Sequence, residues 1–156
     1  FSHNVINIDH SLQYANGHAF VCEEHPEAKQ PSVKLNLCEV YKEKAKSAYR
    51  KFTLLNNYTI EVEDEVNLLD AGSKVSWVAG TKANVEVNGN KAHFMRNGKH
   101  FYMQIIAPAG AVFKTYPAKN TYKGEKTIEG ITMLEAECSF KETDGKVTIQ
   151  MSSKKF

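Results

Sequence analysis

The sequence predicts an all-β protein, an antiparallel β-sandwich of about twelve short strands. Three observations carry this prediction. Short runs of alternating apolar and polar residues recur along the chain, and Gly, Asn and Pro turn signals separate them at intervals of roughly 8–12 residues. Only residues 39–46 have a helical composition. That segment is too short to be stable alone, so we expect one helical turn that links two strands.

Length and charge narrow the possible classes of protein. A chain of 156 residues suits one domain, so we expect residues 1–156 to form a single β-sandwich. The net charge is +2 and the cations are scattered, which argues against a nucleic-acid partner. No apolar run approaches the ~20 residues of a membrane span, and no signal peptide is visible. The start at Phe1, without an initiator Met, indicates the C-terminal part of a larger protein.

The first strands are expected at residues 3–9, 18–24 and 32–38. In the first, Ile6 and Ile8 point to the same side, because side chains two positions apart share a face. A clean alternation in the third places Val33, Leu35 and Leu37 on the dry face.

Residues 48–69 predict the hairpin around which the sheet is organised. Glu61, Glu63 and Glu65 alternate with apolar residues, so we expect a solvated face and an apolar face. A loop of three or five residues keeps apolar residues opposite each other and a cation opposite an anion. That register gives three cross-strand pairs: Leu54 with Ile60, Phe52 with Val62, and Arg50 with Asp64.

A strand at residues 74–79 carries Trp77, which we interpret as a core residue, and residues 83–103 form a three-strand meander. Two-residue turns are predicted at Asn88–Gly89 and Asn97–Gly98, because both favour positive φ. The predicted pairs are Val85 with Ala92, Ala83 with Phe94, Phe94 with Phe101, Ala92 with Met103, and Glu86 with Lys91.

Another strand is expected at residues 111–116. The last hairpin is expected over residues 131–151, with its turn at Asp144–Gly145. In that hairpin Phe140 faces Ile149 and Cys138 faces Met151.

Residues with chemical side chains give no complete motif. Three cysteines at wide spacing form neither a disulfide framework nor a CxxC pair, so we expect three buried thiols at Cys22, Cys38 and Cys138. Six histidines lack the spacing of a zinc site and are interpreted as surface or strand-end residues. No GxSxG motif, P-loop or dinucleotide fingerprint is present. These features alone indicate a soluble β-sandwich domain and predict no cofactor.

Several segments, taken together, resemble the C-terminal half of heparinase II/III-like polysaccharide lyases. Residues 2–9 (SHNVINID) are similar to the family's S-H-N-x-x-x-I-[DN] opening, and residues 17–21 (GHAFV) to the strand that follows. Residues 35–41 (LNLCEVY) and 48–54 (AYRKFTL) resemble its D-L-T-x-A-Y-P and W-x-R-x-x-x-L segments. Residues 60–64 (IEVED) match I-x-[IV]-x-D. The resemblance covers about the first 70 residues in order.

The resemblance implies a domain that works beside a larger partner. In this mostly bacterial, exported family an N-terminal (α/α) toroid precedes the sandwich, and the two cleave uronic-acid polysaccharides such as glycosaminoglycans by β-elimination. A base removes the proton next to the uronate carboxylate, and an acid protonates the leaving oxygen. An Asn or His neutralises the carboxylate charge, which makes that proton removable. We therefore expect an acidic polysaccharide and a toroid domain as partners, and a periplasmic or secreted location.

The resemblance also assigns site residues. The family's sandwich contributes one His to the active site, at the H of S-H-N, which here is His3. The adjacent motif residue, Asn4, would bind substrate or orient His3. Some relatives bind zinc in this domain through His and Asp ligands, one of which is a His just before the strand near Arg50. This chain has Tyr49-Arg50-Lys51 there instead, so no metal is predicted. In the family a Tyr, an Asn and a His of the active site come from the toroid. Residues 1–156 alone lack that Tyr and Asn and should therefore lack lyase activity.

Two other readings stay open at this point. A stand-alone carbohydrate-binding sandwich would present exposed aromatic side chains on one face and bind glycan without an upstream partner. A structural or adhesive domain would leave turnover unchanged when His3 is replaced by Ala.

Overall fold

The computed structural model describes residues 5–11, 13–119 and 129–156 of the chain. Within these ranges α1 is the only helix, and no helix is long and apolar enough to cross a membrane. The elements are β1 (Ile6–Ile8), β2 (Phe20–His25), β3 (Ser32–Asn36), α1 (Cys38–Tyr41), β4 (Ala45–Asn56), β5 (Thr59–Leu68), β6 (Val75–Thr81), β7 (Asn84–Asn88), β8 (Lys91–Arg96), β9 (Lys99–Ala107), β10 (Phe113–Pro117), β11 (Thr132–Cys138) and β12 (Asp144–Ser152).

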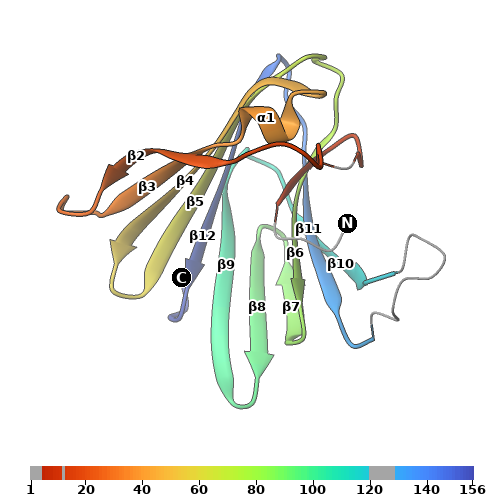
Figure 1. Ribbon diagram of the computed structural model, residues 1–156. Coiled ribbons are helices and arrows are strands. Elements are labelled where there is room, and N and C mark those ends of the chain that lie inside the picture. The colour runs from red at the N-terminus through yellow and green to blue at the C-terminus, as the bar shows by residue number, and fades with distance from the viewer. Residues whose placement is uncertain (1–4, 12, 120–128) are drawn as a thin grey trace.

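These strands form two antiparallel sheets, which confirms the predicted β-sandwich. The larger sheet has eight strands in the order β2-β3-β4-β5-β12-β9-β8-β7, and the smaller has four in the order β1-β6-β11-β10. Figure 1 shows β2, β3 and β4 extending away from β6, β10 and β11. The smaller sheet therefore lies over one part of the larger sheet and leaves the β2–β4 end to one side.

The hairpin of β4 and β5 has the predicted register. Its pairs include Leu54 with Ile60, Phe52 with Val62, and Arg50 with Asp64. On the outer face Gln150 donates to Glu61 at 2.9 Å, and Lys146 lies 3.0 Å from Glu63 and 3.2 Å from Glu65. The three glutamates therefore occupy a polar, partly solvated face, as the alternation predicted.

The meander of β7, β8 and β9 confirms one predicted turn and corrects the other. Asn97 and Gly98 have φ of +51° and +72°, as the type I′ turn requires, and Phe94 pairs with Phe101. The first turn instead consists of Gly89 and Asn90. Only Gly89 has positive φ there, as in a type II′ turn.

This correction moves the β7–β8 register by two residues. The predicted pairs of Val85 with Ala92, Ala83 with Phe94, and Glu86 with Lys91 are wrong; Val85 pairs with Phe94, Val87 with Ala92, and Glu86 with His93. Asn90 holds the turn in this place, because its amide donates to the Ile105 carbonyl at 2.9 Å. A two-residue shift keeps every side chain on its predicted face.

The predicted last hairpin is wrong. β11 lies between β6 and β10 in the smaller sheet, whereas β12 lies between β5 and β9 in the larger one. Cys138 consequently pairs with Val75, and Met151 pairs with Ile60 and Met103. The chain crosses from one sheet to the other next to Gly145, where the Phe140 ring occupies the space that any Cβ would need.

The core lies between the two sheets. Trp77, at 2% exposure, is a core residue as predicted, and it belongs to the same buried cluster as Leu134 from β11 and Ile149 from β12. Burying one such side chain contributes about 1.5–3 kcal/mol. Of the cysteines, Cys138 is buried and Cys38 is half-buried, but Cys22 on the edge strand β2 is exposed. The prediction of three buried thiols is therefore wrong for Cys22.

Candidate functional site

The predicted site residues His3 and Asn4 lie outside the residues that the structure describes. What the structure does describe is the strand that follows them. β1 has only three residues and pairs with one neighbour, β6, through Ile6 opposite Trp77 and Ile8 opposite Val75. So short an edge strand makes few ladder bonds, and side chains from other elements hold it in place.

Tyr41, at the end of α1, holds β1 from one side. Its hydroxyl donates to the Ile6 carbonyl at 2.9 Å and accepts a hydrogen bond from the Gln13 amide at 2.7 Å. Burial raises the pKa of Tyr41 from 10.0 to about 12, so this hydroxyl stays protonated and remains a donor.

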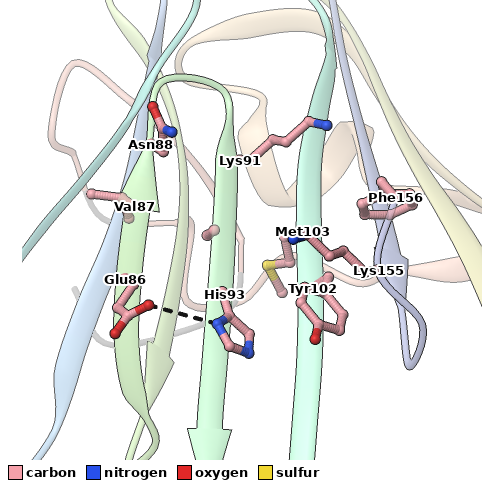
Figure 2. Close-up of a pocket in the computed structure, with 10 residues that line it drawn as sticks. Glu86, Val87, Asn88, Lys91, His93, Tyr102, Met103, Lys155 and Phe156 are labelled. Carbon is pink, nitrogen blue, oxygen red and sulfur yellow. Dashed lines mark ion pairs between the residues drawn. The ribbon is translucent and has the colours of Figure 1, made fainter.

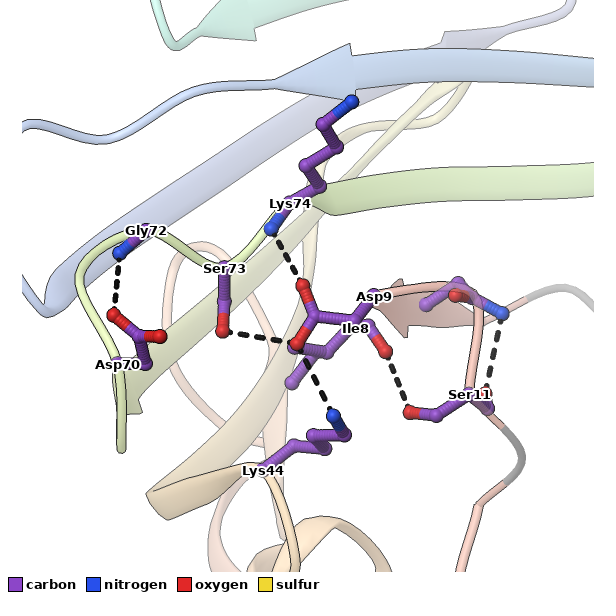
Figure 3. A network of polar contacts seen from close by, with 9 residues as sticks. Ile8, Asp9, Ser11, Lys44, Asp70, Gly72, Ser73 and Lys74 are labelled. Atoms are coloured by element: carbon purple, nitrogen blue, oxygen red, sulfur yellow. Dashed lines mark hydrogen bonds and ion pairs between the residues drawn. The ribbon is translucent and has the colours of Figure 1, made fainter.

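Asp9 fixes the other end of β1 (Figure 3). Its carboxylate accepts hydrogen bonds from the Lys74 backbone N–H at 2.9 Å, the Ser73 hydroxyl at 3.0 Å and the Lys44 ammonium at 3.2 Å. The Lys74 N–H is the largest cause that lowers the pKa of Asp9, and burial opposes it. The network joins β1 to the segments that lead into β4 and β6.

A second feature is the part of the larger sheet that the smaller sheet does not cover. Val62 and Ile149 are 3% and 0% exposed, whereas Leu54 and Ile60, on the same face, are 40% and 44% exposed. Leu54 and Ile60, together with Val33 and Phe52, line a shallow groove of about 410 Å³. We call Val33, Phe52, Leu54 and Ile60 the open face.

An ion pair lies where the open face meets the core. Arg50 Nε donates to Asp64 Oδ1 at 2.7 Å, and Arg50 Nη2 to Oδ2 at 2.8 Å. The Arg50 and Asp64 side chains are 12% and 1% exposed, so the ion pair is largely buried beside apolar residues of the sheet. The Arg50 side chain is directed at Asp64, and its neighbour Tyr49 lies under the Lys34 ammonium at 4.8 Å from the ring centre.

These arrangements limit the chemistry that the described ranges can perform alone. A general base needs an available lone pair at the substrate. The carboxylates of Asp9 and Asp64 are both occupied by hydrogen-bond donors. In the residues that the structure describes, no group of three or more His, Cys, Asp or Glu side chains is placed so that it could hold a metal ion. Asp9 and Asp64 therefore join the strands and segments that they contact.

Sequence reasoning missed Tyr41, Gln13 and the Asp9 network. Tyr41 contacts a strand 35 residues away, and Asp9 accepts from a residue 65 positions away. Local alternation carries no signal for contacts of that range. Asp9 and Tyr41 do lie in two of the segments that resemble the lyase family, residues 2–9 and 35–41.

No protein-family model and no curated protein matches the sequence. Solved structures do match the fold. A heparinase III gene product aligns with a TM-score of 0.73 and 15% identity over 96% of this chain, which is 23% of that protein. A mutant of the heparan sulfate lyase HepC from Pedobacter heparinus aligns with a TM-score of 0.76 and 12% identity over 96% of this chain and 24% of its own.

Another heparinase III structure has a TM-score of 0.68 and 12% identity, with 96% of this chain and 23% of that chain covered. This chain therefore spans less than a quarter of the length of the proteins it matches. Its fold is the fold of one domain within such lyases.

Proposed function

We propose that this chain is the C-terminal sandwich domain of a heparinase II/III-like lyase, which cleaves uronic-acid polysaccharides by β-elimination. One observation carries the proposal: nearly the whole chain, 96%, aligns with under a quarter of a heparinase III gene product and of a heparan sulfate lyase HepC mutant. The S-H-N opening before β1 supports the same assignment. As in other exported members of that family, the protein would act in the periplasm or outside the cell.

In this proposal His3 is the catalytic residue that the sandwich contributes. Its imidazole exchanges a proton with the substrate, while a Tyr and an Asn from a helical toroid complete the acid–base set and neutralise the uronate carboxylate. Asn4 binds substrate or orients His3. The anchoring of β1 by Tyr41 and Asp9 supports this role, because a catalytic side chain needs a rigid point of attachment.

The open face is the surface that the toroid covers, and the sandwich thereby forms one wall of the substrate cleft. Leu54 and Ile60 expose a contiguous apolar surface to water, and surfaces of this kind mark contacts with another domain or protein. The remaining three quarters of the length of the matched lyases is the region that supplies the contact.

The test is a comparison of His3→Ala with His25→Ala in the protein that contains the toroid. His25 lies at the exposed end of β2 and serves as the matched control. We expect His3→Ala to lower the release of unsaturated uronate from heparan sulfate by 10²-fold or more, the usual size of an acid–base contribution. His25→Ala should retain activity. Equal activity of the two variants would contradict the catalytic role of His3.

A second comparison tests the cleft wall. Residues 1–156 alone should release no unsaturated uronate. In the longer protein, Ile60→Asp should weaken the contact between the domains and lower turnover, whereas Glu61→Gln, on the other face of β5, should not. Release of unsaturated uronate by the isolated domain would contradict this arrangement.

A further inference from the structure

A cluster of ring side chains lies on the outer face of β7, β8 and β9, away from the open face. Figure 2 shows Glu86, His93 and Tyr102 side by side on these three strands. His93 Nδ1 is 3.7 Å from the Glu86 carboxylate, and His93 Nε2 is 2.9 Å from Nδ1 of His100. We propose that His93 and His100 form a binding site for a divalent transition-metal ion, with Glu86 as a positioning residue.

The two turns of the meander bring these residues together. The type I′ turn at Asn97–Gly98 sets His93 opposite Tyr102, which places His100 diagonally across from His93 on the same face. The type II′ turn at Gly89 sets Glu86 opposite His93. The cluster is therefore fixed by backbone geometry at two independent turns.

Neighbouring side chains orient the His93 ring as they do in a metal-binding histidine. Its ring lies against Tyr102, with 4.7 Å between centroids and 5° between planes, and its side chain is 27% exposed. The Glu86 carboxylate favours a proton on Nδ1, which leaves the lone pair on Nε2. A carboxylate on the far nitrogen is the usual orienting partner of a metal-binding histidine.

His100 presents a second nitrogen to that lone pair. The centroids of the two imidazoles are 5.1 Å apart while their nearest nitrogens are 2.9 Å apart, and the planes differ by 13°. These values place the rings edge to edge in nearly one plane, with nitrogen directed at nitrogen. With the proton of His93 on Nδ1, the hydrogen bond between the rings is donated by Nδ1 of His100, and its proton lies between the two nitrogens.

A metal ion can take the place of that proton. His100 then carries its proton on Nε2, transferred through solvent, and both facing nitrogens donate lone pairs to the ion. Two nitrogens at about 2.0–2.1 Å from zinc are about 3.3 Å apart at the tetrahedral angle. In the structure the two nitrogens are 2.9 Å apart and point at each other. To bind the ion, the exposed His100 side chain must rotate, so that its lone pair and that of His93 meet at the ion instead of facing each other.

The donor set indicates the class of ion. Neutral imidazoles suit zinc, copper and nickel, whereas magnesium and calcium prefer oxygen ligands. Since no third His, Cys, Asp or Glu converges here among the residues described, water completes the coordination. The bound ion would join β8 to β9, and this inference does not depend on the proposed lyase function.

The experiment is a zinc titration of the 156-residue chain. Calorimetry measures the heat of binding, and NMR records the imidazole C–H resonances during the titration. We expect one equivalent to bind and to shift the signals of His93 and His100. His93→Gln and His100→Gln should each weaken binding at least tenfold, and Glu86→Gln by about tenfold. His25→Gln, at an exposed strand end, should bind as the wild type does.

Zinc should also raise the melting temperature of the wild type and of His25→Gln, but not of His100→Gln. His100 is exposed, so this variant keeps the fold and tests the site even if His93→Gln is unstable. Wild-type zinc affinity in His100→Gln, or zinc-induced shifts confined to other histidines, would overturn the proposal.

Discussion

Arg50 and Asp64 face each other across β4 and β5 and form a two-point ion pair at 2.7 and 2.8 Å inside the larger sheet. Burial raises the pKa of the Asp64 carboxyl, and the two hydrogen bonds from Arg50 oppose that rise. Neither group has ready access to water, so the stability of each buried charge depends on the hydrogen bonds within the pair.

Replacement of Arg50 alone should be costly. Arg50→Met leaves the Asp64 carboxylate buried without its cation, and we expect a loss of about 3–5 kcal/mol in the free energy of unfolding. The double variant Arg50→Met/Asp64→Leu removes both charges and should recover most of that loss. Urea unfolding of the three proteins measures both values; a double variant no more stable than the single one would refute the explanation.

Tyr41→Phe should loosen β1 without disturbing the rest of the core. The loss of the hydroxyl removes the bond to the Ile6 carbonyl and costs about 1 kcal/mol. Faster amide hydrogen exchange in β1, with little change in β12, would reveal the local effect.

The same variant should alter the stability at high pH. The pKa of Tyr41 is raised from 10.0 to about 12 in the folded state, so its contribution is complete below pH 10 and is lost as the pH rises toward 12. Wild type should lose more stability across this interval than Tyr41→Phe. The raised pKa of the Cys138 thiol affects both proteins alike and cancels in the comparison.

Asp9→Asn should be destabilising at neutral pH and nearly neutral in acid. The pKa of Asp9 is lowered from 3.8 in the folded state, so its contribution is present above that value and is lost as the pH falls through the folded pKa. The difference in unfolding free energy between wild type and variant should therefore shrink below pH 3.8. Glu27→Gln, in the exposed loop after β2, should show no such change and serves as the control. A difference that stays constant with pH would contradict the role of Asp9.

One thiol should react under native conditions. Cys22 is exposed on β2, whereas burial raises the pKa of Cys138 to about 12 and keeps it as a thiol. We expect iodoacetamide to modify Cys22 first and Cys138 only after unfolding, as mass spectrometry of the digested protein can follow. The variant Cys22→Ser should lose the fast phase. Rapid modification of Cys138 in the folded chain would show that the core opens.

The sequence was most informative where two local signals agreed. The β4–β5 register followed from the match of apolar residues together with the pairing of Arg50 with Asp64. At Gly89 one signal was insufficient, because Asn88–Gly89 and Gly89–Asn90 are both acceptable turns, and a bond from Asn90 to a distant strand decides between them.

Other features depend on contacts that no local pattern encodes. Alternation placed Ile60 on the apolar face correctly, but it does not tell whether a second layer covers that face, and Ile60 is exposed. The Asp144–Gly145 turn signal predicted that β11 and β12 pair, yet each finds its partners in a different sheet. His3 and Asn4 rest on the family resemblance and stay predictions.

The position of β12 has a consequence for how the protein is made. This strand, at residues 144–152, lies between β5 and β9 near the middle of the larger sheet (Figure 1). During synthesis β5 and β9 each keep one unpaired edge until residues 144–152 leave the ribosome. Unpaired strand edges can associate with other chains. The domain should therefore fold only after residue 152 has left the ribosome, and nascent chains that stall before residue 144 should need a chaperone to remain soluble.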